Sequence, residues 1–292
     1  MSGALAMGGV RFAQDSLLTR LALDVLAQAG PLSTPEVAAR VLGIRGAAGP
    51  AARAVFALLG GDPRFGVSGE GVWSLAPAEP PPAPARPLRD EEWVVVDLET
   101  TGGSPKRGHR VTEVAAVRVA GGEIRDTWCT LVNPERGIPG LITALTGITQ
   151  EMVTGAPRFH EVAGAVTSAI EGGVFVAHNA AFDWRFLCHE LQRAAGLLPE
   201  GRQLCTVRLA RKLLPELPSR SLDALALYFG VEIECRHRAL DDAVATARVL
   251  IRFLEMLEER GAADWEGLQA VLKKRARRPR KRRASPRSME AA

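Results

Sequence analysis

Asp97 and Glu99 stand at the end of an apolar, β-branched run at residues 93–96, just before a Thr-Thr-Gly turn at residues 100–102. Such a run predicts a buried central strand. Because side chains alternate along a strand, the two carboxylates point to the same face. Two ionised acids this close repel unless a cation or a shared proton lies between them. Hard divalent cations such as Mg²⁺ prefer oxygen-rich sites of this kind, although an ordinary strand ending in a polar turn is the alternative.

Two further stretches combine a histidine with acids. One runs from His178 to Asp183 and the other from His237 to Asp242. Each alone has a simple explanation, because an acid in a helix's first turn is favoured by the dipole and a histidine before a helix is commonly a surface or capping residue. Together with the first pair they supply five acids and two histidines.

With these three stretches in this order, the chain resembles the histidine branch (DEDDh) of the DEDD superfamily of 3′→5′ exonucleases, in particular the epsilon proofreading subunits of bacterial DNA polymerase III. The likeness covers about residues 92–257. It implies an α/β, ribonuclease H-like fold and two Mg²⁺ or Mn²⁺ ions. It also implies that His237 is the general base, that Asp241 is only a helix-start or surface acid, and that the metal-binding acids are Asp97, Glu99, Asp183 and Asp242.

The resemblance also implies which residues contact substrate. Thr100, Thr101 and Gly102 follow the acids, and Asn179 lies across the expected cleft. Thr146 belongs to a segment that resembles the family's nucleotide-packing stretch. Epsilon subunits usually carry histidine there, so the chain departs from the replicative subunit at this position.

The remaining histidines and cysteines are not expected to bind metal. His178 has no thiolate nearby and is expected to shape its loop. The other three histidines are expected to be exposed: His109, His160 and His189. The four cysteines lack a Cys-x-x-Cys spacing, which argues against a disulfide framework and a zinc knuckle and predicts small core residues: Cys129, Cys188, Cys205 and Cys235.

The composition favours two domains and places the positive charge at one end. The chain has 292 residues, of which 47% are hydrophobic. Residues 273–292 carry ten Lys and Arg and one acid, so with a total of +4 the rest of the chain is net −5. This tail is expected to be disordered and to bind nucleic-acid phosphates, or only to aid solubility. No apolar run approaches the roughly 20 residues that cross a bilayer, and no basic leader is present, which predicts a cytoplasmic protein without a membrane partner.

Residues 13–75 are predicted to form a small winged-helix-like α+β domain. Three helical patterns precede two strand-like segments around a glycine-rich turn at residues 65–75. The third helix carries only Arg53 as a basic residue, whereas a reader of duplex DNA normally shows a basic face. We therefore expect a structural or docking role ahead of DNA reading. Half of residues 76–87 are proline, which predicts a semi-rigid linker over residues 76–90.

Residues 91–258 are predicted to form the exonuclease domain, a mixed central sheet with flanking helices. The side chain of Asn179 is expected to cap the helix that follows it. Besides the first strand, the patterns predict strands at residues 110–119, 123–131 and 174–177 and helices at residues 159–171, 206–213, 221–229 and 239–258.

The expected function is metal-dependent 3′→5′ hydrolysis of phosphodiester bonds at DNA 3′ ends, with release of nucleoside 5′-monophosphates in replication or repair. The polarity and the products come from the resemblance. Two alternatives are a 3′→5′ exoribonuclease and a docking module for nucleic acid or a polymerase. A pure binding module has no use for a repulsive carboxylate cluster, which weighs against that alternative. A DNA polymerase or another replication or repair protein is the expected protein partner.

Overall fold

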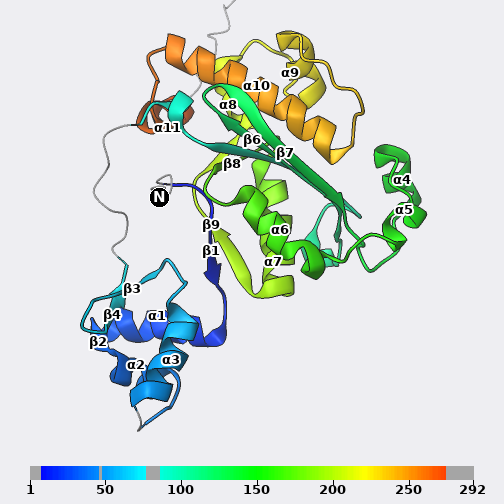
Figure 1. Cartoon of the computed structure of the whole chain (residues 1–292). Helices are drawn as coiled ribbons and strands as arrows, with labels where there is room; N and C mark the ends of the chain where they lie inside the picture. The colour runs from blue at the N-terminus through cyan, green and yellow to red at the C-terminus, as the bar shows by residue number, and fades with distance from the viewer. Residues whose placement is uncertain (1–7, 46–47, 77–85, 274–292) are drawn as a thin grey trace, which may run out of the picture.

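The structure is a computed structural model that describes residues 8–45, 48–76 and 86–273. A small N-terminal unit and a larger α/β body are linked in sequence through residues 77–85, which lie outside the described residues (Figure 1). The body contains a five-stranded sheet in the order β10-β8-β5-β6-β7. Its strands are β5 (Trp93–Thr100), β6 (Val111–Ala120), β7 (Glu123–Leu131), β8 (Val174–Ala177) and β10 (Gln203–Cys205).

The sheet is mixed. β5 pairs antiparallel with β6 and parallel with β8, and β10 pairs parallel with β8. The predicted antiparallel start and the buried strand at residues 174–177 are therefore both present. The carboxyl ends of β5 and β8 lie side by side, and in open α/β sheets such adjacent carboxyl ends commonly form the binding crevice.

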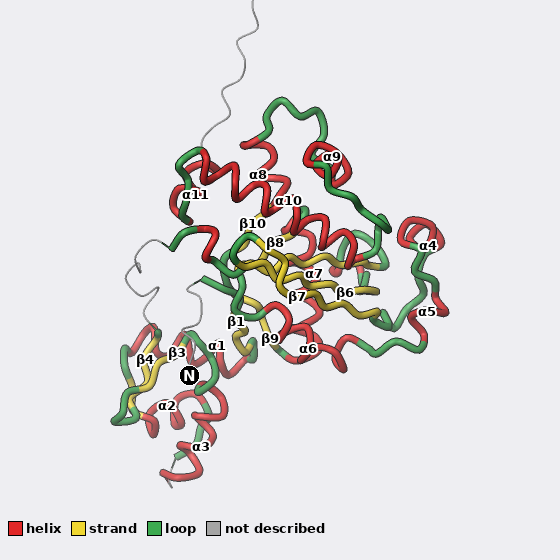
Figure 2. The backbone as a smooth tube through the Cα atoms, turned by 45° about the horizontal axis from the view of Figure 1, so that its top comes forward, coloured by secondary structure: helices red, strands yellow, loops and turns green. Residues whose placement is uncertain are grey.

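Helices cover both faces of the sheet, as Figures 1 and 2 show. On one face, α6 (Phe159–Ile170) and α7 (Ala180–Ala195) pack on Val94 and Val96 of β5. On the other, α8 (Thr206–Leu213) and α10 (Ala239–Glu259) pack on Trp93 and Val95. The alternation of β5 therefore directs Asp97 and Glu99 toward the α10 side.

The N-terminal unit has its own core around Trp73 and Leu59. Its sheet has the order β2-β4-β3. This element order is the one that a winged helix would have, and that interpretation stays a prediction. The elements are α1 (Leu17–Ala29), β2 (Leu32–Ser33), α2 (Thr34–Val41), α3 (Ala48–Leu59), β3 (Phe65–Val67) and β4 (Val72–Leu75).

The boundaries of the two units differ from those expected. Strand β1 (Arg11–Gln14) pairs with β9 (Leu197–Glu200) of the larger body, so residues 13 and 14 belong there and not to the N-terminal unit. Leu88, expected in the linker, is buried because its side chain packs in the core beside α10. The body also continues past residue 258 into α11 (Trp265–Lys273), whose Leu268 is buried in the same core.

Two short helices, α4 (Gly140–Thr146) and α5 (Gln150–Thr154), lie in a stretch for which no element was predicted. The helices expected near residues 206, 221 and 239 are α8, α9 (Leu222–Phe229) and α10. The tail beyond residue 273 lies outside the described residues. Among the helices of the described ranges, none combines the length and the apolar character that crossing a membrane requires.

The prediction of core cysteines is wrong for the exposed Cys129 and Cys235, whereas Cys205 packs against the core on the α6 and α7 side of the sheet. All four are free thiols; Cys129 and Cys235 are exposed, while Cys188 and Cys205 are half-buried. Cys129 lies on β7, an edge strand of the sheet that is largely exposed. Burial raises the pKa of the Cys188 thiol to about 11, which makes it a poor nucleophile near neutral pH.

Candidate active site

Asp97 and Glu99 lie near the carboxyl end of β5. Both side chains are half-buried, unlike the buried valines before them. Glu99 lies opposite Glu113 of β6 in the register, and the pairing shifts just after it. Three carboxylates thus lie near one end of two neighbouring strands.

Glu113 holds the start of α10 in place, and Asp242 lies in the first turn of that helix. Oε2 of Glu113 accepts a hydrogen bond from the backbone N–H of Ala239 at 2.9 Å, and its Oε1 accepts one from Nη2 of Arg238 at 2.7 Å. The side chain is only 3% exposed. Asp242 lies in the first turn of α10, where it accepts a hydrogen bond from the backbone N–H of His237 at 3.3 Å. Sequence reasoning missed Glu113, because nothing local marks a strand acid as the partner of a distant helix.

Glu99, His237 and Asp242 come together as a possible ion-binding group. One ligand atom of each lies within 4.8 Å of the others. Two of the predicted metal-binding acids and the predicted base are therefore adjacent, although β5 and α10 are far apart in the sequence.

Asp183 comes from the opposite face of the sheet. It lies in the first turn of α7 and is buried. Its carboxylate interacts with the backbone of Leu98 in β5 and with the charges of Asp97 and Glu99. The structure therefore brings all four predicted acids to the carboxyl end of β5.

The electrostatics of this cluster are unfavourable without a counter-charge. Burial and the charge of Asp242 raise the pKa of Asp97 to about 8. Burial and the charges of Asp97 and Asp242 raise the pKa of Glu99 to about 9. The pKa of Asp183 is raised well above its ordinary value by burial and by the charge of Asp97. At neutral pH such carboxyls hold protons unless a cation is bound between them.

The donor set fits a divalent cation. The Oδ1 atom of Asp242 is buried and accepts no hydrogen bond within the described residues, so one member of the cluster has an unused ligand atom. Several carboxylate oxygens and one imidazole suit hard divalent ions. Arg236 now offsets part of the negative charge, since its guanidinium donates to the other carboxylate oxygen of Asp242. This arginine was not predicted to belong to the site, although it directly precedes His237.

Backbone conformation is unusual at two of the predicted residues. Among the described residues, only Glu135, Asn179 and His237 combine a side chain with a positive φ, at 55°, 85° and 60°. Positive φ values outside glycine cost free energy and concentrate at functional sites. Asn179 stands before α7 as expected, but its side chain makes no capping hydrogen bond. The capping prediction was wrong, since Asn179 has a left-handed backbone and a side-chain cap normally requires an extended one.

The Thr-Thr-Gly turn is held tightly by its neighbours. Thr101 is buried, its N–H donates to the carbonyl of Arg110 at 2.8 Å, and its hydroxyl accepts from the N–H of Arg110 at 3.0 Å. The Thr100 hydroxyl donates to the carbonyl of Gly102 at 2.9 Å. The backbone N–H of Thr101 is therefore not available to a nucleotide. Gly102 has φ 148°, and a Cβ there would lie 2.7 Å from the ring of His109, so this position requires glycine.

Thr146 is also used internally. Its hydroxyl donates to the carbonyl of Ile142 at 3.0 Å and accepts from the N–H of Ile148 at 3.1 Å, and the residue is buried. The turn after α4 therefore already satisfies this hydroxyl, and the predicted substrate contact of Thr146 stays a prediction. Leu141 and Leu145 on the same helix are instead 86% and 52% exposed.

The remaining histidines differ in their surroundings. Nδ1 of His178 lies 2.9 Å from the hydroxyl of Thr206, which ties the loop before α7 to the start of α8. Burial and the charge of Arg236 lower the pKa of His178 to about 4, so it stays neutral at pH 7. Only His160 is exposed as expected; His109 accepts a hydrogen bond from the N–H of Ser104, and His189 is half-buried.

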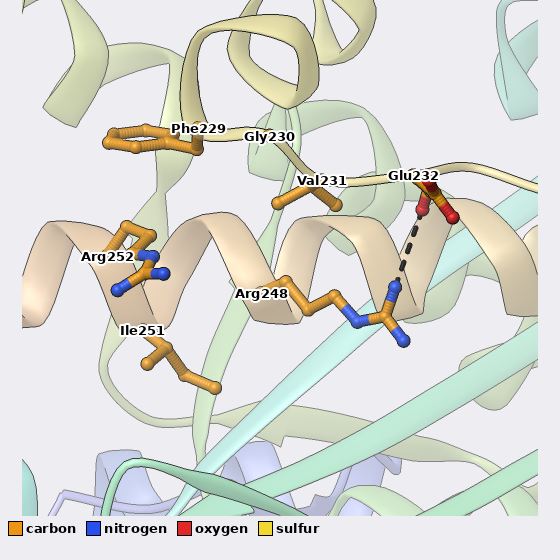
Figure 3. A pocket seen from close by; sticks show the side chains of 7 residues that line it. All are labelled: Phe229, Gly230, Val231, Glu232, Arg248, Ile251 and Arg252. Carbon is orange, nitrogen blue, oxygen red and sulfur yellow. Dashed lines mark hydrogen bonds between the residues drawn. The ribbon is translucent and has the colours of Figure 1, made fainter.

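A separate pocket lies between the end of α9 and α10 (Figure 3). Arg248 on α10 donates to the carbonyl of Glu232 across it, at 3.4 Å, and Arg252 lines it further along the helix. None of the predicted site residues lines this pocket.

Comparisons with known proteins agree with the geometry. Residues 94–250 match a family described as exonuclease. The chain is 38% identical over 187 residues to the DNA polymerase III subunit epsilon of Aquifex aeolicus, which covers 64% of this chain and 92% of that protein. It is 43% identical over 176 residues to DNA polymerase III PolC-type of Clostridium perfringens, covering 60% of this chain and 12% of that protein.

One solved structure bears on the fold alone. E. coli Exonuclease I in complex with a dT13 oligonucleotide is 19% identical with a TM-score of 0.50, over 62% of this chain and 46% of that one. The predicted ribonuclease H-like sheet with flanking helices is confirmed. The chain spans only 31% and 12% of the length of two of its larger relatives. On the family match and the near-complete coverage of an epsilon subunit, the chain belongs to the exonuclease family, with the family's domain at residues 94–250.

Proposed function

We propose that the protein hydrolyses phosphodiester bonds one nucleotide at a time from the 3′ ends of DNA, releasing nucleoside 5′-monophosphates with two divalent ions, Mg²⁺ or Mn²⁺. One observation carries the proposal. Four acids from β5, α7 and α10 converge with raised pKa values, and a buried Asp242 oxygen has no partner within the described residues. A cluster that repels itself in the absence of cations is suited to bind them.

The roles follow from position. Asp97, Glu99, Asp183 and Asp242 would hold the ions, with Asp97 between the other acids. When bound, two divalent ions lower the pKa of the attacking water and stabilise the charge on the leaving oxygen. His237 is half-buried next to Glu99 and Asp242, and it accepts the proton from that water. The hydrogen bond from the backbone N–H of His237 to the Asp242 carboxylate keeps the base and the acid close together.

The Thr-Thr-Gly turn and Asn179 would border the terminal nucleotide. Since both threonine hydroxyls serve the turn itself, its exposed edge offers backbone groups around Gly102 and Gly103. Leu145, which is exposed near the internal Thr146, would supply an apolar surface for a base. Leu145 belongs to the same predicted nucleotide-packing segment as Thr146.

The test is a degradation assay with the full chain. DNA and RNA oligonucleotides of the same sequence, labelled at the 5′ or the 3′ end, are incubated with Mg²⁺ or Mn²⁺, with and without a chelator. A 3′ label released at once as mononucleotide and a 5′ label that shortens stepwise support the proposal. Preference for RNA would favour the exoribonuclease alternative. Binding without metal-dependent cleavage would favour the docking module.

We further propose that the N-terminal unit contacts a protein, such as a polymerase or another replication or repair protein, and does not read duplex DNA. Helix α3 has Arg53 as its basic residue, while Leu17, Leu18 and Leu21 of α1 are exposed. Arg53→Glu in the full chain should therefore leave duplex binding unchanged. Removal of residues 274–292 should flatten the salt dependence of DNA binding instead. The cytoplasmic location stays a prediction.

A further inference from the structure

A basic pocket lies beside the Thr-Thr-Gly turn, outside the carboxylate cluster. Its volume is about 510 Å³, and it is formed by the loop after β5, the loop after β7 and the second half of α7. The charged and titratable residues that line it are Lys106, Arg110, Glu135, Arg136, His189 and Arg193.

The positive charge of this pocket is only partly neutralised. Arg110 is buried and forms a two-point ion pair with Glu190, with N–O distances of 2.7 and 2.9 Å. A single acid, Glu135, lies within 4.0 Å of the guanidinium groups of three arginines: Arg110, Arg158 and Arg193.

Two further cations have no acidic partner in the described part of the chain. Lys106 is exposed and makes no ion pair there, and Arg136 donates only to the carbonyl of Gly108. Five cations therefore surround two carboxylates, on a chain that is net −5 outside its tail. A local excess of positive charge on a net-negative body attracts an anion.

An imidazole nitrogen in the pocket also lacks a partner within the described residues. Nδ1 of His189 is buried and forms no hydrogen bond within the described residues. Glu135, with its φ of 55° and its N–H bound to the Asn133 side chain at 2.9 Å, is held in a strained turn over the arginines. An anionic ligand could take up both the unused imidazole nitrogen and the unpaired cations.

The pocket is coupled directly to the candidate active site. The carbonyl of Arg110 accepts a hydrogen bond from the N–H of Thr101, and the N–H of Arg110 donates to the Thr101 hydroxyl. Arg110 therefore contacts the Thr-Thr-Gly turn and also lines the pocket. His189 and Arg193 lie on the same helix as Asp183, roughly 9 and 15 Å further along its axis at 1.5 Å per residue.

On these contacts, and resting on the proposed nuclease function, we propose that this pocket binds backbone phosphates of the substrate strand beyond its terminal nucleotide. Lys106, Arg136 and Arg193 make the phosphate contacts. Arg110 is a positioning residue, because its charge is already paired with Glu190. Glu135 competes with the phosphates for the arginines and so limits affinity.

The test measures DNA binding by the full chain carrying Asp97→Asn, which prevents degradation. In that background, the triple variant Lys106→Ala/Arg136→Ala/Arg193→Ala is compared with the control Arg125→Ala/Arg248→Ala/Arg252→Ala. The control removes three exposed arginines away from the pocket, two of which appear in Figure 3. Fluorescence anisotropy is recorded over a salt series with a single-stranded oligonucleotide, a dinucleotide and a nucleoside monophosphate.

The pocket variant should bind the oligonucleotide about tenfold more weakly than the control and reduce the slope of log affinity against log salt by up to about 2, at roughly 0.7 per lost contact. Binding of the dinucleotide and the monophosphate should be unchanged. Glu135→Gln should bind the oligonucleotide more tightly, a gain that misfolding cannot produce.

Equal affinity of the two triple variants would overturn the pocket assignment. An equal loss for the monophosphate would show that the pocket holds the terminal or free nucleotide instead of the upstream strand. Degradation by the unmodified chain is scored separately. If that chain does not degrade DNA, the proposed function fails; if it does and the triple variants bind alike, only the pocket proposal fails.

Discussion

Arg236 donates through Nη1 to Oδ2 of Asp242 and through Nη2, at 3.2 Å, to Oδ2 of Asp223. Burial raises the pKa of Asp242, and the hydrogen bond from Arg236 opposes that rise. The guanidinium is thus an internal counter-ion for an acid that is proposed to bind metal. A cation that enters the cluster competes with Arg236 for Asp242.

Arg236→Gln should therefore bind divalent metal more tightly. The substitution removes the competing charge from the metal-free state, and an increase of about tenfold in Mn²⁺ affinity corresponds to about 1.4 kcal/mol. Isothermal titration calorimetry with Mn²⁺ measures this. Arg252→Gln, which breaks an exposed ion pair with Glu255, is the control and should change nothing. Weaker Mn²⁺ binding by Arg236→Gln would mean that the arginine supports the metal site.

Asp97→Asn should abolish degradation and at the same time stabilise the metal-free protein. The substitution removes the central repulsive charge, whose burial raises its pKa to about 8. Loss of activity of at least about 1000-fold is expected, since the proposed ion position loses its shared ligand. Thermal unfolding in chelator at pH 8 should show a higher midpoint than the unmodified chain. Asp241→Asn, next to Asp242 but outside the cluster, is the matched control, and comparable loss there would contradict the assignment.

The metal-free protein should lose stability as the pH rises from about 4 to about 9. The folded state holds protons on Asp97 and Glu99, with pKa values of about 8 and 9, that the unfolded chain releases near pH 4. Because the folded state binds more protons in this window, the free energy of unfolding falls with increasing pH. Urea titrations in chelator at several pH values measure the trend. Saturating Mg²⁺ should flatten it, and a flat profile without metal would disprove the clustering of these acids.

The site residues that could be predicted from the sequence are close together in the chain, and their short spacing indicates which side chains lie near one another. Asp97 and Glu99 lie on one face of a strand, and Asp242 follows His237 at the family's offset across a helix start. Such patterns also predicted the long helices and four of the five strands of the central sheet, because periodicity is local. They did not predict the short strand β10.

Contacts between distant elements could not be predicted in this way. Glu113 and Ala239 are separated by 126 positions, and Arg110 and Glu190 by 80. Each is a polar group whose partner is chosen by the packing of the whole sheet, so no local signal distinguishes Glu113 from an exposed strand acid. The same limit applies to β1, a short strand that forms a two-stranded sheet with β9, far away in the sequence.

Glu113→Gln should reduce both stability and activity. The charged side chain pairs with Arg238 and accepts the N–H of Ala239, so the change weakens the anchor of α10. Breaking a buried pair of this kind, with Arg238 partly exposed, costs about 2–3 kcal/mol. Thermal unfolding and the degradation rate measure the two effects. Glu123→Gln on the exposed edge of β7 is the control. Normal activity in a destabilised Glu113→Gln protein would show that the anchor does not position His237 and Asp242.

Val10→Ala should destabilise the exonuclease body, although residue 10 precedes the N-terminal unit. Val10 is fully buried against the α6 and α7 side of the sheet, and its backbone bonds to Gly172 and Gly173 at 2.9 and 2.8 Å. Loss of its buried methyl groups is worth about 2 kcal/mol, or roughly 4–8 °C in the unfolding midpoint of a body of this size. The substitution should lower the midpoint of the unfolding transition whose midpoint Mg²⁺ raises, since that transition belongs to the exonuclease body. Leu17→Ala removes a side chain that is 83% exposed and should leave that transition in place. If both substitutions shift the Mg²⁺-sensitive midpoint equally, β1 does not contribute to the body through Val10.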